Sequence, residues 1–426
     1  MAVVLSTSTL EVRTFLALAA VIVASRAVGW MVARVGQPQV HGEILAGIVL
    51  GPSLLGWVWP QAMAYLFPGQ VITFLNVLAQ VAVVMFMFLV GLSVDLSKLQ
   101  GHGRKALVIS PASILVPIAL GALLSLWLYP RLGDGVGRLG FTLFLGAAMA
   151  ITAFPVLARV LQETGMADTR IGILVITCAA VDDITAWCLL AVVVAVVRSS
   201  GFPSAMATIA ESLVFVAVAL KVVKPLMARL ESFPLWLAIC LPLLGAWLTS
   251  QIGVHAIFGA FIAGAVIPRN QPLQQQIRMR LEPVTVTFLL PVFFVVVGLL
   301  TTVGLLDSPY LWAVTGLVIV TAVAGKWGGS MVAARAMGES WGDAAAIGIL
   351  MNTRGLTELI ILTVGLQLKV ISATVFTIMV LMALVTTWMA TPLLALISPL
   401  YRRGQTAPRG DAAAAAATPD TEGSVA

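Results

Sequence analysis

The residues best suited to chemistry are two adjacent carboxylates, Asp182 and Asp183, in a stretch that is otherwise apolar. A carboxylate at the centre of a bilayer costs about 2.5 to 3.5 kcal/mol on insertion scales, so such residues usually mark an ion or proton pathway. A proton or a small cation can each neutralise a buried carboxylate, but not both at once. The pair therefore predicts a site at which a proton and a monovalent cation compete.

A lysine and a polar cluster lie in other apolar segments. Lys326 is deep in its segment, where an unpaired ammonium is costly and a buried carboxylate is the natural partner. We therefore expect Lys326 to pair with the aspartates. The run from Asn352 to Glu358 places polar and charged residues at membrane depth, and Arg354 lies one helical turn before Glu358, so these two are expected to pair.

Two apolar segments are predicted to contain broken helices. Pro155 removes a backbone hydrogen bond from one of them, and the cluster around Asn352 interrupts the other. Irregular backbone at this depth is tolerated where it is buried in protein or lines a cavity, and the opened helix ends can bind ions. Thr152, the backbone around Phe154 and the Asn352 side chain would supply neutral oxygen ligands beside the aspartates.

The composition places all of these residues in a membrane. The chain is 60% hydrophobic and 10% charged, and its mean hydropathy is +1.05, whereas soluble domains are about 45 to 50% apolar and 25% charged. A window of about 19 residues predicts an all-α polytopic protein with about thirteen transmembrane helices. The expected spans are 14–34, 42–56, 71–92, 106–130, 139–162, 172–197, 204–227, 233–250, 252–268, 283–305, 310–335, 343–368 and 371–398.

Basic residues divide unequally between the two sides of these spans, sixteen against five. The excess of lysine and arginine marks the cytoplasmic side, which predicts an external N-terminus and a cytoplasmic C-terminus. Topology thus explains the net charge of +6, and no nucleic-acid partner is expected. The cytoplasmic set is Arg34, Lys98, Arg104, Lys105, Arg159, Arg170, Lys221, Lys224, Arg229, Arg269, Arg278, Arg280, Arg335, Arg402, Arg403 and Arg409; the external set is Arg13, Arg131, Arg138, Arg198 and Lys369.

The sequence also repeats itself. Phe86–Leu92 is similar to Phe293–Leu299, and Leu45–Val49 is similar to Ile262–Val266, each pair being seven expected spans apart. An odd offset means that the two copies enter the membrane from opposite sides, which is the inverted-topology repeat of many secondary transporters. The two broken helices then occupy corresponding positions and are expected to cross.

Three regions are expected along the chain. Residues 1–13 form an external segment, and residues 14–403 form the membrane domain, with a core around 106–197 and 310–398. Residues 404–426 are rich in Ala, Pro, Gly and charged side chains and are expected to be a disordered cytoplasmic tail.

Six motifs occur in this order along the chain: Gly36–Ser53, Phe88–Leu92, Ile151–Arg159, Ala179–Asp183, Gly253–Gly264 and Asn352–Leu359. Together they resemble the monovalent cation:proton antiporter-2 family, which includes the Kef-type membrane domains. The resemblance runs from about Gly36 to Ser398. It implies the sodium/proton antiporter fold, with a dimerisation domain and a moving core, and a homodimer in the cell membrane.

The same resemblance assigns roles to single residues. Asp183 matches the ion-binding aspartate, Asp182 matches the residue that pairs with a lysine in electrogenic members, and Lys326 matches that lysine. The chain departs from Kef-type potassium members, which carry glutamine in the place of Asp182, and from plant relatives that carry asparagine there.

These features together predict a secondary active antiporter that exchanges Na⁺, with K⁺ as the alternative, for protons at Asp183 by alternating access, without a cofactor. Two acids beside Lys326 predict more than one proton per cation, whereas the break at 151–155 is similar to that of family members for which electroneutral exchange is the alternative. A solute symporter or a cation channel on the same architecture are the alternatives, because a fold alone does not fix function. An enzyme is not expected, since aspartyl proteases need carboxylates on two facing elements and adjacent helical residues point about 100 degrees apart.

Overall fold

The computed structural model describes residues 7–37, 39–93, 103–133, 137–167, 169–198, 202–229, 234–268 and 270–397, which form helices joined by short connections. The expected tail at 404–426 lies outside the described residues. The first helix, α1 (Thr7–Arg34), begins earlier than the expected span at 14–34 and so includes part of the segment 1–13.

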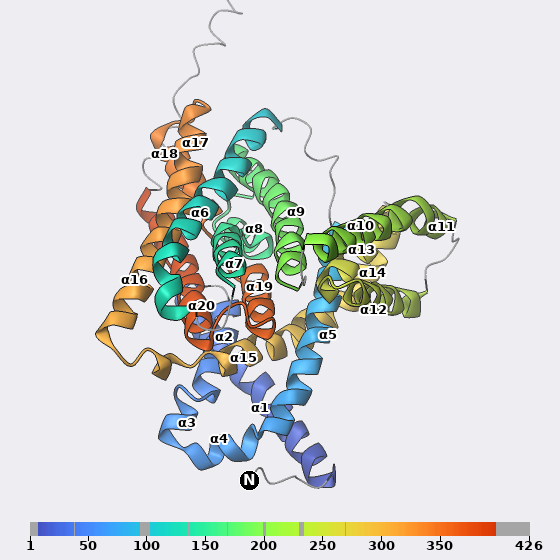
Figure 1. The fold of residues 1–426 in the computed structure, drawn as a ribbon, viewed down its shortest axis with the longest axis vertical. Coiled ribbons are helices and arrows are strands. Elements are labelled where there is room, and N and C mark those ends of the chain that lie inside the picture. Colours follow the sequence, from blue (N-terminus) through green and yellow to red (C-terminus); the bar gives the residue numbers. More distant parts are fainter. Residues whose placement is uncertain are drawn as a thin grey trace, which may run out of the picture.

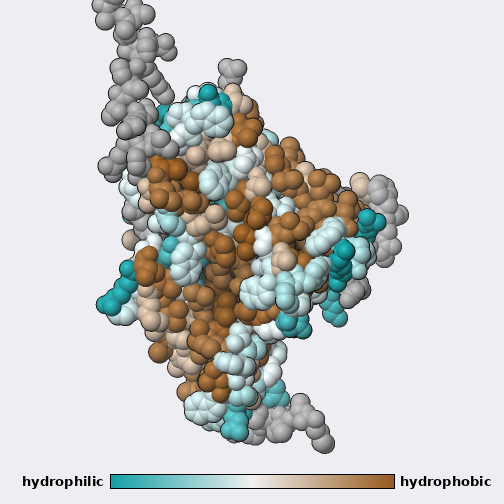
Figure 2. Space-filling model, turned by 90° about the vertical axis from the view of Figure 1, so that its left-hand side faces the viewer, coloured by the Kyte–Doolittle hydropathy of each residue, from teal (hydrophilic) through white to brown (hydrophobic). Residues whose placement is uncertain are grey.

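Among the described residues, nine helical segments are long and apolar enough to cross a membrane, and one bent pair adds a tenth. Three shorter apolar helices, α7 (Arg138–Ala150), α12 (Leu235–Gln251) and α13 (Ala256–Ala265), lie in the other three expected spans. The polytopic all-α fold is thus confirmed, although three of the thirteen expected spans hold an apolar helix that is shorter than a full crossing. Figure 2 shows a broad apolar surface over the middle of one face, which suits contact with lipid.

The helices form two groups (Figure 1). What we call the core group lies at the upper left of this view, and the scaffold group lies below it and to its right. The core group consists of α6 (Gly103–Leu132), α7, α8 (Phe154–Glu163), α9 (Arg170–Arg198), α16 (Pro309–Val323), the π-helical turn Ala324–Gly328, α17 (Gly329–Ala336), α18 (Trp341–Met351), α19 (Leu356–Gln367) and α20 (Ala373–Trp388). The scaffold group consists of α1, α2 (Gln39–Leu50), α3 (Leu55–Val58), α4 (Pro60–Leu66), α5 (Gly69–Ser93), α10 (Phe202–Val218), α11 (Lys224–Ala228), α12, α13, α14 (Gln271–Val284) and α15 (Leu290–Leu300).

Two glycine contacts show how the inverted repeats interlock. A Cβ added to Gly47 on α2 would lie 2.8 Å from the Cα of Gly298 on α15. A Cβ added to Gly264 on α13 would lie 2.1 Å from the carbonyl oxygen of Phe88 on α5. Small residues permit such close packing of helices in membranes. The Leu45–Val49 motif of the first repeat thus packs against the Phe293–Leu299 motif of the second repeat, and Phe86–Leu92 packs against Ile262–Val266. The two contacts correspond to each other, in keeping with the predicted inverted topology.

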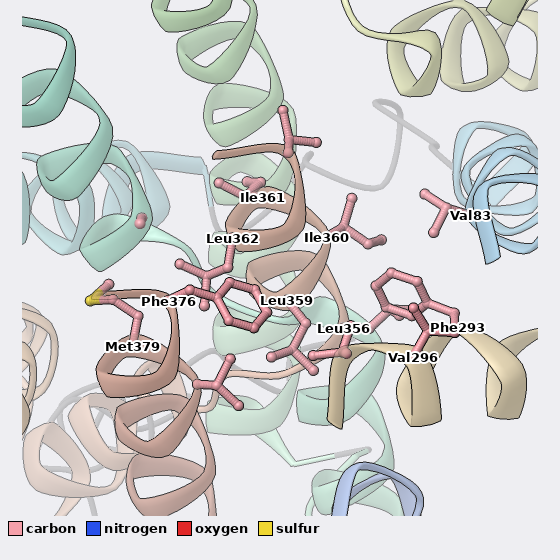
Figure 3. Packing of buried hydrophobic residues seen from close by; sticks show 14 of the residues in the cluster. Val83, Phe293, Val296, Leu356, Leu359, Ile360, Ile361, Leu362, Phe376 and Met379 are labelled. Carbon is pink, nitrogen blue, oxygen red and sulfur yellow. The ribbon is translucent and has the colours of Figure 1, made fainter. Parts of the chain in front are cut away.

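Helix α19 lies where the two groups meet. Its first ten residues are all buried, as expected for a helix that is apolar on every side. Figure 3 shows Leu359, Ile360 and Leu362 of α19 between Phe376 of α20 and Phe293 of α15. This packing fixes the second half of a broken helix against both groups.

Candidate functional site

Two broken helices meet within the core group. The first consists of α7 and α8, which are separated at 151–153, and the second consists of α18 and α19, which are separated at 352–355 with a bend of 43°. The Ala153 amide donates a hydrogen bond to the Thr353 carbonyl over 3.0 Å. Pro155 lies in the first turn of α8, where its missing N–H is tolerated, so the chain breaks just before the proline.

The second break is held by a glycine and by a threonine from α20. Gly355 has a φ of 153°, and a Cβ at this position would lie 2.7 Å from Val156 Cγ2, so the site requires glycine. Thr387 Oγ1 accepts a hydrogen bond from the Arg354 amide at 2.8 Å and donates to the Arg354 carbonyl at 2.9 Å. Thr387 thereby satisfies both backbone polar groups of Arg354.

The last carbonyls of α7 are bound by two buried cations. A helix end leaves such carbonyls without intrahelical donors. Arg354 donates from Nη1 to the Ala148 oxygen at 3.2 Å and from Nη2 to the Met149 oxygen at 2.7 Å, and Lys326 Nζ donates to the Ala150 oxygen. The negative end of the helix dipole therefore faces two positive charges.

Irregularities in two helices explain the position of Lys326. The residue lies in the π-helical turn between α16 and α17, a feature that is frequent at functional sites. On α6, Pro117 has no N–H and leaves the Ser113 carbonyl without its helical donor. Lys326 Nζ donates to that carbonyl at 2.9 Å and forms an ion pair with Asp182 Oδ2 at 3.0 Å. The structure thus brings together the lysine and the aspartate that the sequence indicates as partners.

Asp182 is completely buried and accepts hydrogen bonds from four side chains. Ser110 Oγ donates to Oδ1 at 2.6 Å, while Ser113 Oγ, Thr152 Oγ1 at 3.0 Å and Lys326 Nζ donate to Oδ2. Sequence reasoning missed both serines, whose only signal is their spacing of one helical turn on α6. Thr152, which we expected to be a cation ligand, donates here to Asp182.

Asp183 has a different environment, although it is also buried. Its carboxylate contacts the backbone amide of Phe154 at the start of α8, where the positive end of a helix dipole favours an anion. Its Oδ1 atom has no hydrogen-bond partner among the described residues, and neither does Oδ1 of Asn352 at the second break. Of the two adjacent carboxylates, Asp183 therefore presents the free oxygen.

Arg354 and Glu358 form a second buried pair, with Nη1 and Oε1 3.1 Å apart and both side chains inaccessible to solvent. A small cavity adjoins Arg354 between the core and scaffold groups, and its lining includes His41 of α2, Val156 of α8 and Gly355. In each of the two sequence-predicted pairs, the cation binds carbonyls at the end of α7.

An ion-pair cluster forms around Glu339, which lies outside the membrane-spanning segments in the turn between α17 and α18. Glu339 is 2% exposed; its Oε1 accepts from Lys105 Nζ at 2.5 Å and its carboxylate accepts two bonds from Arg170, at 2.7 and 2.5 Å. Burial alone would raise the pKa of Glu339, but the hydrogen bonds and charges of Arg170 and Lys105 outweigh it and lower the pKa to about 2. The cluster ties α6 and α9 to the hairpin of α17 and α18.

The sequence is similar to those of known transporters. The family described as "Sodium/hydrogen exchanger, transmembrane" matches residues 18–397. The chain is similar to the Na⁺/H⁺ antiporter NhaS4 of Synechocystis, with 44% identity over 88% of this chain and 94% of that one. It is also similar to the cation/H⁺ antiporter 19 of Arabidopsis thaliana, with 35% identity over 90% of this chain, but it spans only 49% of that longer protein.

A solved structure has the same fold. The sodium proton antiporter MjNhaP1 of Methanocaldococcus jannaschii superposes with a TM-score of 0.64 over 93% of this chain and 99% of that one, at 14% identity. Identity this low supports the shared fold alone.

Proposed function

The chain belongs to the sodium/hydrogen exchanger family, and on this premise we propose that it exchanges a monovalent cation for protons by competition at Asp183. The family resemblance seen in the six sequence motifs is confirmed at this level. Sodium is the cation we expect, in keeping with the relative at 44% identity, which is a Na⁺/H⁺ antiporter, and potassium is the alternative. One observation carries the proposal: Asp183 keeps an unpartnered oxygen while Asp182 beside it is bound by four donors.

The surrounding residues support this competition by holding the break open and by supplying neutral oxygens beside Asp183. Arg354 and Lys326 bind the terminal carbonyls of α7, so the chain remains broken beside the site. Glu358 compensates the charge of Arg354. When a cation arrives, the Asp183 carboxylate, with neutral oxygens from the break and from Asn352, would bind it and release the proton; Thr152 contributes through its bond to Asp182. Alternating exposure of Asp183 to the two sides then completes exchange.

The protein is a multi-pass membrane protein, and we place its N-terminus outside and its C-terminus in the cytoplasm. Lys105, Arg170 and Arg335, which the charge bias assigns to the cytoplasm, all contact Glu339. Their convergence from three helices supports the assignment. We also propose that the core group moves against the scaffold group within the membrane domain 14–403, and that the protein acts as a homodimer, as its family resemblance implies.

Counterflow in proteoliposomes tests the exchange. Purified protein is reconstituted with a pH-sensitive dye inside, and sodium, potassium or lithium is added outside in turn. We expect saturable, cation-dependent proton release that is driven in either direction by the pH gradient. Cation flux that does not saturate and moves no protons would indicate a channel, and proton movement in the same direction as the cation would indicate a symporter.

A further inference from the structure

Each member of the buried pair Lys326 and Asp182 has bonds beyond the pair itself. Lys326 Nζ also donates to the backbone carbonyls of Ser113 and Ala150. Asp182 also accepts from the hydroxyls of Ser110, Ser113 and Thr152. If the ammonium and the carboxylate moved apart, both would therefore still be hydrogen-bonded, which an isolated buried ion pair would not allow.

Ser110 and Ser113 supply most of this additional support for the carboxylate. They lie one turn apart on α6, so both hydroxyls face the same side of the helix. Ser110 binds Oδ1 and Ser113 binds Oδ2, so the two carboxylate oxygens are held from one helix. Hydrogen bonds to an ionised acceptor are roughly twice as strong as neutral ones. The carboxylate is thus fixed in orientation relative to the next residue, Asp183.

We propose that Ser110 and Ser113 are positioning residues of the exchange site, which hold the Asp182 carboxylate beside Asp183 through bonds additional to its ion pair with Lys326, so that the ion pair can open without releasing Asp182. The inference rests on the proposed function, because it assigns a role within the same cation site. Neither serine touches the cation; each acts through Asp182.

Ser125 provides a matched control on the same helix. It is also completely buried, but its hydroxyl bonds the Ala122 carbonyl at 2.6 Å and the Thr142 hydroxyl at 2.8 Å, both of which are neutral. Losing this hydroxyl removes a buried serine from α6 without changing the contacts of Asp182. Any effect shared by Ser125→Ala and the serine variants therefore reports general packing.

The test is a cycle of variants measured by sodium-driven proton release in proteoliposomes. We expect Ser110→Ala with Ser113→Ala to raise the KM for sodium about tenfold with a smaller loss of maximal rate, and Lys326→Gln to lower kcat/KM about tenfold. Combining all three substitutions should reduce kcat/KM at least about tenfold beyond the product of these separate losses, because Asp182 then loses both supports. Ser113→Thr, which keeps the hydroxyl, should have a KM near that of the wild type.

Several outcomes would overturn the inference. One is a loss of kcat/KM in the triple variant that equals the product of the separate serine and lysine losses. Another is serine variants with the same KM and maximal rate as Ser125→Ala. If the double serine variant does not fold, the single variants Ser110→Ala and Ser113→Ala are compared with Ser113→Thr in the same way. If the proposed function itself is wrong, Asp183→Asn will still exchange cations for protons. If Asp183→Asn is inactive and the serine variants behave like the wild type, only the positioning role is rejected.

Discussion

The Ala153 amide donates to the Thr353 carbonyl over 3.0 Å, and this bond joins the two helix breaks directly. The join brings helix ends of opposite polarity into one small volume. The carboxyl end of α7 faces Arg354 and Lys326, and the amino end of α8 faces Asp183. Each charged side chain thus lies at the helix end whose dipole favours it, which allows ionisable groups to be buried at a membrane crossing.

Asp183→Asn should abolish cation-driven proton release, because an amide carries no charge that a proton or a cation can neutralise. The substitution keeps the size of the side chain, so the variant should insert and purify like the wild type. Dye-based flux in proteoliposomes measures the loss, with the thermal unfolding midpoint in detergent as the check on folding. Exchange at the wild-type rate in this variant would exclude Asp183 as the shared site.

Arg354→Gln should lower the free energy of unfolding by about 3 to 5 kcal/mol, because Glu358 is left as an uncompensated buried acid and two α7 carbonyls lose their donors. Glu358→Gln should cost less, since Arg354 keeps both carbonyls. The double variant Arg354→Gln with Glu358→Gln should be more stable than Arg354→Gln alone. Unfolding midpoints of the three variants in one detergent decide this, and an equal or larger loss for Glu358→Gln would contradict it.

Signals that are local in the sequence predicted much of this arrangement. Hydropathy gives the spans, and Pro155 and the cluster around Asn352 indicate the breaks, because each acts on the backbone next to it. The attraction of Lys326 for a buried acid follows from the cost of burying either charge alone. These inferences need no knowledge of which helices are neighbours.

The remaining contacts depend on tertiary packing. Ser110 and Ser113 bind an acid that is 72 and 69 residues away. A serine within an apolar helix commonly bonds its own backbone, as Ser125 does with Ala122 and as Ser113 also does with Ser110. Glu339 lies 234 residues from Lys105 and 169 from Arg170. Nothing in the residue types at these positions identifies their partners.

The Glu339 cluster should stabilise the protein in a pH-dependent way. Its pKa of about 2 lies below the ordinary 4.5, so its contribution is present in full above pH 4.5 and is lost as pH falls towards 2. We expect about 2 kcal/mol, less than the pKa difference alone would give, because the Lys105 and Arg170 side chains are 35% and 33% exposed. Glu339→Gln should therefore unfold at a lower temperature than the wild type at pH 7.

The comparison is made by thermal unfolding in detergent between pH 7 and pH 2. The difference between the wild type and Glu339→Gln should shrink over the acid range. Glu282→Gln is the control, because its pair with Arg278 is about half exposed on both sides and should contribute little. A stability gap for Glu339→Gln that is unchanged from pH 7 to pH 2 would show that the cluster is not held by charge.

Cysteine labelling should place the two ends of α6 on opposite sides of the membrane. Helix α6 begins at Gly103 and ends at Leu132, so Arg104 and Arg131 lie near its two ends. In a variant without Cys178, Cys188 and Cys240, Arg131→Cys should react with an impermeant maleimide in intact cells, and Arg104→Cys should react only after permeabilisation. External labelling at position 104 would reverse the assigned orientation.

Transport should be electrogenic, with more than one proton moved per cation. One monovalent cation displaces the proton of Asp183. A second proton is moved if Lys326 pairs again with Asp182 on the return half-cycle, and the two side chains are close enough to do so, with Nζ and Oδ2 3.0 Å apart. A sodium jump on proteoliposomes adsorbed to a solid-supported membrane should then give a transient current in the wild type and none in Asp183→Asn. Parallel dye measurements on the same vesicles report proton exchange. Clear exchange without current would refute this stoichiometry and leave the antiporter assignment intact, because competition at Asp183 alone is sufficient for electroneutral exchange.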